Sequence, residues 1–129
     1  MNNNTVGEFI PNQDAIDKVE KGVLGALVKT AQFIRTDAVA RQVIPFDYGN
    51  LQRDVGYDFD EKGNAAYIIH NRPYAIYVYN GDGMHFQTVN NINAQSHWYK
   101  AYEGQGERVE TVNRFYADQV KQLSEGIVK

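Results

Sequence analysis

Cysteine is absent from the 129 residues, and this absence excludes several kinds of site at once. Without a thiol the chain has no disulfide, no cysteine nucleophile and no cysteine ligand for a metal ion. No apolar run approaches the roughly 20 residues that cross a bilayer, and Met1–Thr5 contain neither a basic patch nor an apolar segment. We therefore expect a soluble protein that is made in the cytoplasm and held together by packing alone.

Clustered basic charge is also missing. The 13 Lys and Arg residues are outnumbered by 16 Asp and Glu residues, which gives a net charge of −3, and no stretch concentrates the positive side chains. Since phosphate backbones are bound mainly through such clusters, sequence-specific nucleic acid is not an expected partner, and neither is a membrane. The length and the 43% apolar content fit one globular domain over residues 1–129.

A long amphipathic helix is predicted from Asn12 to about Gln42. Asn12 suits the N-cap, whereas Gly22 and Gly25 predict either a kink or the close approach of another backbone. Residues 1–11, before this helix, are expected to be flexible. The predicted helix places apolar or small residues on one stripe at steps of three or four, namely Ile16, Val19, Val23, Leu27, Ala31, Ile34 and Ala38.

A second amphipathic helix is predicted near the C-terminus, with Gly126 as its C-cap. Its apolar stripe consists of Val109, Val112, Tyr116, Val120, Leu123 and Ile127. Trp98, Tyr99 and Tyr102 precede it and are predicted to form an aromatic anchor.

Strand patterns fill the middle of the chain. Pro45 ends the first helix, and a turn predicted through Leu51 leads to a hairpin with strands over 55–60 and 65–69. A third strand is predicted over Tyr74–Tyr79. Residues 80–95 are predicted to form a long mobile loop, and a short strand around Phe86–Val89 is kept as an alternative within it. The predicted fold is α+β: a small antiparallel sheet of three or four strands, packed by a long N-terminal helix and a C-terminal helix.

The sequence contains no pattern typical of catalytic, cofactor-binding or metal-binding residues, so the chain is not expected to be an enzyme. The stretch from Asp58 to Gly63 resembles the start of a calcium loop, but Ile69 stands where a bidentate glutamate is required. The histidines, His70, His85 and His97, do not have the spacing of a zinc site. Ser96 beside His97 is the only local pairing of a hydroxyl with an imidazole, and neighbours in sequence rarely face each other.

The order of these motifs resembles that of the minor capsid or head–tail joining proteins of tailed phages and prophages. The family's corner motif, Pro-x-Asp-Thr-Gly-x-Leu, is matched at Pro45, Asp47, Gly49 and Leu51, with Tyr48 in place of the threonine. Pro73-Tyr74-Ala75 is similar to the family's Pro-Tyr-Ala strand, and Trp98-Tyr99 to the aromatic pair before its last helix. Tyr79-Asn80-Gly81 departs from relatives that often carry an acidic residue before the glycine.

This resemblance implies a structural virion component at the junction between capsid and tail, without cofactors. The protein would form a ring with copies of itself and bind neighbouring head–tail or tail proteins. We expect the contacts to involve Tyr74, Tyr77, Tyr79, Met84, His85 and Phe86. The four corner residues would determine the fold. The alternative is a small host module that binds a protein or a single-stranded nucleic acid, because Tyr77 and Tyr79 would share one strand face.

Overall fold

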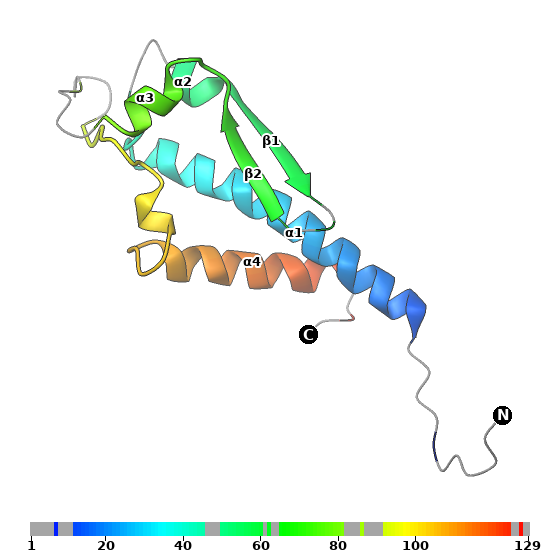
Figure 1. Ribbon diagram of the computed structural model, residues 1–129. Helices are drawn as coiled ribbons and strands as arrows, with labels where there is room; N and C mark the ends of the chain where they lie inside the picture. Colours follow the sequence, from blue (N-terminus) through cyan, green and yellow to red (C-terminus); the bar gives the residue numbers. More distant parts are fainter. Residues whose placement is uncertain are drawn as a thin grey trace.

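The computed structural model describes residues 7, 12–45, 50–60, 62, 65–81, 86, 92–124 and 127. A long central helix carries a β-hairpin on one side and a second long helix on the other (Figure 1). In chain order the elements are α1 (Gln13–Ala40), α2 (Asn50–Arg53), β1 (Val55–Asp60), β2 (Ala65–His70), α3 (Ala75–Tyr79), the 3₁₀ turn η1 (Lys100–Tyr102) and α4 (Val109–Leu123). Within these described ranges, no helix is both long enough and apolar enough to cross a membrane.

The predicted start of α1 is confirmed. The Asn12 side chain accepts a hydrogen bond of 3.1 Å from the backbone N–H of Ala15, which caps the first turn. Of the two alternatives for the helix glycines, close approach is correct at Gly22, because a Cβ there would lie 3.0 Å from the backbone nitrogen of Ser124 at the end of α4. The second predicted helix is confirmed as α4, but it ends before Ile127, and the predicted cap at Gly126 lies outside the described residues.

The predicted hairpin is confirmed, with β1 and β2 paired antiparallel and Phe59 opposite Ala66. The third predicted strand is wrong, because Tyr74–Tyr79 forms helix α3 and its N-cap. Ala75 is buried, whereas the next two residues, Ile76 and Tyr77, are both exposed. A strand with one buried face would bury every second residue, so this pattern is that of a helix. The sheet therefore has two strands in the described part of the chain, not three or four. Of the possible fourth strand, only Phe86 belongs to the described residues.

The core lies at the C-terminal end of α1, where α3, η1 and the start of α4 meet. Trp98 and Ile44 are its largest fully buried members, with 1% and 0% of their surface exposed. Farther along the contact between the two long helices, the rings of Phe33 and Phe115 stack at 4.4 Å. The buried core cluster consists of Ala38, Val43, Ile44, Leu51, Ala75, Trp98, Tyr102 and Val112.

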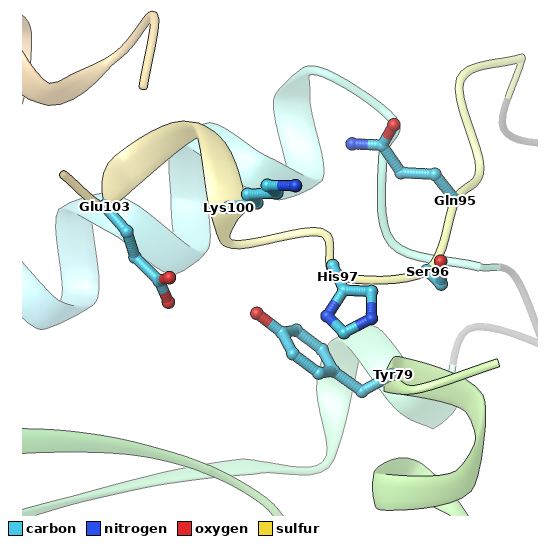
Figure 2. A pocket seen from close by; sticks show the side chains of 6 residues that line it. All are labelled: Tyr79, Gln95, Ser96, His97, Lys100 and Glu103. Carbon is cyan, nitrogen blue, oxygen red and sulfur yellow. The ribbon is translucent and has the colours of Figure 1, made fainter. Parts of the chain in front are cut away.

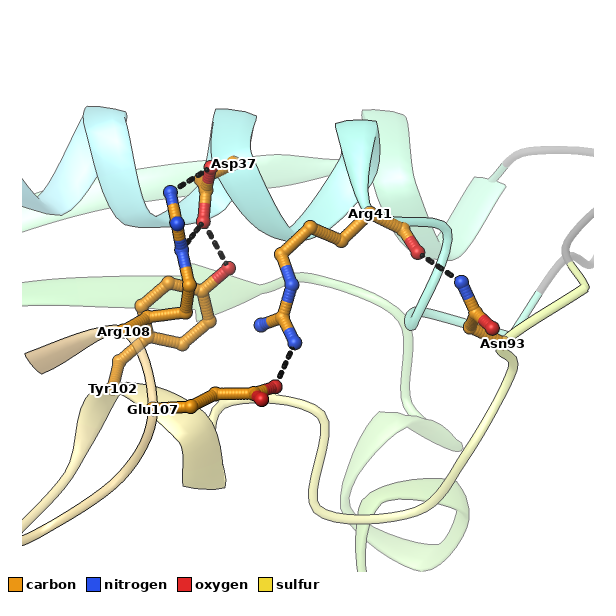
Figure 3. Close-up of polar contacts among 6 residues, drawn as sticks. All are labelled: Asp37, Arg41, Asn93, Tyr102, Glu107 and Arg108. Atoms are coloured by element: carbon orange, nitrogen blue, oxygen red, sulfur yellow. Dashed lines mark hydrogen bonds and ion pairs between the residues drawn. The ribbon is translucent and has the colours of Figure 1, made fainter. Parts of the chain in front are cut away.

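A polar network fastens this end of α1 to η1 and to the segment before α4 (Figure 3). The Asp37 carboxylate accepts a 2.8 Å hydrogen bond from the Tyr102 hydroxyl and two from the Arg108 guanidinium, at 2.8 and 2.9 Å. Arg41 forms an ion pair with Glu107. These contacts join residues far apart in sequence, so they hold the final third of the chain against α1.

Candidate functional site

An aromatic cluster surrounds Trp98 and confirms the predicted aromatic anchor. The ring of Tyr79 meets the indole edge-on, with the centroids 4.7 Å apart, and the rings of His70 and Tyr99 lie at 5.6 and 6.2 Å from it. We use the term aromatic cluster for His70, Tyr79, His97, Trp98, Tyr99 and Tyr102. Its members come from β2, α3 and the segment through η1, so it joins the hairpin to the core.

His70 is a structural member of this cluster. Its Nδ1 lies 2.7 Å from the carbonyl oxygen of Leu51, and its Nε2 lies 2.7 Å from the hydroxyl of Tyr99. Because a carbonyl only accepts, we assign the proton to Nδ1, and Nε2 then accepts the Tyr99 O–H. Burial lowers the pKa of His70, although the bond to Leu51 opposes this effect. The neutral imidazole thus links the end of β2 to α2 and to the segment before η1.

A polar hollow of about 420 Å³ lies next to the cluster (Figure 2). The ring of His97 packs edge-on against Tyr79, with the centroids 5.1 Å apart. The Tyr79 hydroxyl and the Glu103 carboxylate face each other across the hollow. Burial and the charge of Glu103 together raise the pKa of Tyr79. The hollow is lined by Tyr79, Gln95, Ser96, His97, Lys100 and Glu103.

Metal binding has no support among the described residues, where no three His, Asp or Glu side chains gather closely enough to hold an ion. At the hairpin tip, the carboxylates of Asp58 and Asp60 accept backbone N–H bonds from Phe59 and Lys62, at 2.8 and 3.0 Å. Both acids therefore serve the local backbone. The ring of His70 packs against Trp98 and that of His97 against Tyr79, and His85 lies outside the described residues.

Apolar side chains are exposed beside the cluster. Ile76 and Tyr77 of α3 have 65% and 77% of their surface exposed, and Ile69 of β2 has 41%. Ile69 and Ile76 line one hollow, whose other lining residues include His70 and Trp98. We call Ile69, Ile76 and Tyr77 the α3 patch. Large apolar residues exposed in a group typically mark a contact surface.

The expected contact residues that the structure describes differ in exposure. Tyr77 is in the α3 patch, whereas Tyr74 and Tyr79 are half-buried against the core. Phe86 is partly buried, and the expected contacts Met84 and His85 lie outside the described residues.

The corner residues divide in the same way, since Pro45 and Leu51 are buried while Asp47 and Gly49 lie outside the described residues. Sequence reasoning missed α2, which Leu51 anchors with only 1% of its surface exposed. It also missed Arg35, whose guanidinium donates a 3.1 Å hydrogen bond from Nε to the carbonyl of Gln52 in α2. The only available signal was a charged residue beside the apolar stripe of a helix.

No family model matches the chain, and no curated protein or solved structure is significantly similar to it.

Proposed function

We propose that this chain is a minor capsid or head–tail joining protein of a tailed phage or prophage, and forms part of the ring at the capsid–tail junction. The motif order from Pro45 to Trp98-Tyr99 supports this proposal. The role is mechanical: the protein completes the channel and presents surfaces to neighbouring copies and to the next ring. Its location is then the virion.

The exposure of the α3 patch is the observation that carries the proposal. A five-residue helix has little stability of its own, yet α3 directs Ala75 into the core and holds Ile76 and Tyr77 outside. An isolated monomer gains nothing from exposing these two side chains. A neighbouring protein that covers them removes apolar area from water, at about 25 cal/mol per Å².

Binding to a candidate neck protein tests the proposal. We expect Ile76→Ser with Tyr77→Ser to weaken binding by roughly 30-fold, which corresponds to about 2 kcal/mol for the loss of a central apolar anchor. Ile16→Ser is the matched control, because Ile16 is also exposed, at 38%, but lies in the first turns of α1. Titration calorimetry measures both variants.

Two results would contradict the proposal. One is unchanged affinity in the double variant together with a native circular dichroism spectrum. The other is retention of single-stranded RNA by a monomer, with affinity that falls steeply as salt rises, which would favour the nucleic-acid-binding alternative.

A further inference from the structure

The hairpin has two edges that pair with no strand in the described part of the chain. We propose that β2 of one copy pairs with β1 of the next copy, so that the hairpins of neighbouring copies join into one continuous antiparallel sheet. This inference deepens the proposed function and rests on it, since it identifies the contact between copies in the ring. A hairpin of two strands is marginally stable alone, and an open edge is a template for another strand.

The backbone register shows which groups the edges offer. Just outside the strands, the N–H of Asn71 donates to the carbonyl of Asp54 at 2.8 Å. Hydrogen-bonded and non-hydrogen-bonded pairs alternate in an antiparallel ladder, so the pair next to this one, and every second pair after that, directs its N–H and C=O groups outward. The outward pairs are Val55–His70, Tyr57–Ile68 and Phe59–Ala66.

Two observations agree with this register. The N–H of Phe59 donates to the carboxylate of Asp58 on its own strand, at 2.8 Å, and therefore points out of the ladder; on pairing it would exchange this bond for one to the next copy. On β2, no hydrogen bond from the rest of the described chain reaches the backbone of Ala66 or Ile68. Neither strand contains proline or lysine, which commonly protect an edge from pairing, and the two charged residues of β1, Asp58 and Asp60, accept bonds from nearby backbone N–H groups.

One edge carries an exposed aromatic side chain, and the other edge borders a hollow. Phe59 on β1 lies on the same face as its partner Ala66 and has 49% of its surface exposed. A mainly apolar hollow of about 390 Å³ lies beside β2, and no residue of β1 lines it. Its lining includes Ala66 and Ile68 of β2, with Leu27, Ala31 and Ile34 of α1.

Strand pairing would place Phe59 of the next copy beside Ala66 or Ile68, over this hollow. A phenylalanine that is fully buried covers about 150–250 Å². Because Phe59 is 49% exposed, covering it would remove roughly half of that area from water, and its ring would cover α1 residues as well. The aromatic side chain is on one edge and the hollow on the other, so the contact joins two different surfaces. Such a head-to-tail contact closes into a ring when its rotation allows, as the proposed function requires.

Disulfide trapping tests the pairing, and the absence of native cysteine removes any background. If Phe59 of the next copy pairs with Ala66, then Asp58 of the next copy lies opposite Tyr67. If Phe59 pairs with Ile68 instead, then Asp60 of the next copy lies opposite Tyr67. Asp58 and Tyr67 already face each other within one chain, so the cysteines must be in separate chains. Tyr67→Cys is mixed with Asp58→Cys or with Asp60→Cys under mild oxidation, and dimers are counted on a non-reducing gel.

We expect one of these mixtures to give several-fold more dimer than Tyr67→Cys mixed with Glu110→Cys, whose native side chain is 88% exposed on α4. Adding Phe59→Ser to both partners should lower the yield several-fold. Adding Ile127→Ser, at a comparably exposed residue outside the hairpin, should leave it unchanged.

Yields at the Glu110→Cys level, or dimers formed equally well by each variant alone, would overturn the pairing. Sedimentation of the same samples without oxidant separates this failure from a failure of the proposed function. An oligomer that gives no mixed disulfide overturns strand pairing only. A monomer at every concentration also overturns strand pairing, while binding to the neck protein decides the proposed function independently.

Discussion

Two glycines of α1 should respond in opposite ways to the same substitution. In a helix interior, alanine is favoured over glycine by up to about 1 kcal/mol, so Gly22→Ala and Gly25→Ala receive the same benefit. Their surroundings differ. A Cβ on Gly22 would lie 3.0 Å from the nitrogen and 3.1 Å from the Cα of Ser124, whereas a Cβ on Gly25 would meet only a terminal methyl group of Leu123, at 3.1 Å.

The backbone of Ser124 cannot yield without moving the end of α4, and overpacking of this kind costs roughly 1–3 kcal/mol. We therefore expect Gly22→Ala to lower the free energy of unfolding by about 1 kcal/mol after the helix benefit is subtracted. The Leu123 methyl group lies at the end of a rotatable side chain. Gly25→Ala should accordingly raise the free energy of unfolding by roughly 0.5–1 kcal/mol.

Urea denaturation of both variants measures the difference, with circular dichroism at 222 nm and the fluorescence of the buried Trp98 as independent probes. Coincident transitions would support a two-state analysis. If Gly22→Ala stabilises the protein as much as Gly25→Ala does, then α1 and α4 do not pack closely at this point, and the arrangement of the two helices described above is wrong.

Three further predictions concern the polar groups. Because the pKa of His70 is lowered in the folded protein, the unfolded chain binds the proton first, and the free energy of unfolding should fall as pH decreases below about 6.5. Urea denaturation at several pH values measures this, and a His70→Gln variant whose free energy of unfolding falls equally with pH would contradict it. Asp37→Asn should lower the free energy of unfolding by about 1–2 kcal/mol, because the charge-assisted bond from the Tyr102 hydroxyl is weakened. Asp14→Asn, which affects an exposed ion pair with Lys18, should change little, and equal effects would refute the reasoning. Burial raises the pKa of Tyr102 to about 12, so Tyr102→Phe should remove a step at high pH from the absorbance titration of the tyrosines. If that step is unchanged in the variant, it belongs to another tyrosine.

The sequence predicted the elements whose signals are local. Asn12 and the apolar stripe marked α1, and alternation from Val55 to Phe59 marked β1. The segment Tyr74–Tyr79 was predicted as a strand because aromatic and β-branched residues favour strands, whereas its packing against the core favours a helical turn. Composition could not decide between the two, because only tertiary contact shows which side chains are buried.

The candidate site was less predictable for the same reason. The link between Asp37 and Arg108 spans 71 residues and leaves no mark in the local pattern of either. Tyr77 was expected at a contact and is exposed, but its neighbours in the α3 patch depend on a helix that was predicted as a strand. The free edge of β2 became apparent only when the third strand proved to be α3.

We propose that copies of this chain assemble head to tail into a closed ring. The most direct test is the mass distribution in solution, measured by native mass spectrometry over a range of concentrations, alone and with the neck protein. We predict one dominant multiple of the 14.7 kDa subunit, larger than a dimer, which does not grow further as concentration rises. A monomer under all these conditions, or a dimer that never exceeds twice 14.7 kDa, would contradict the claim.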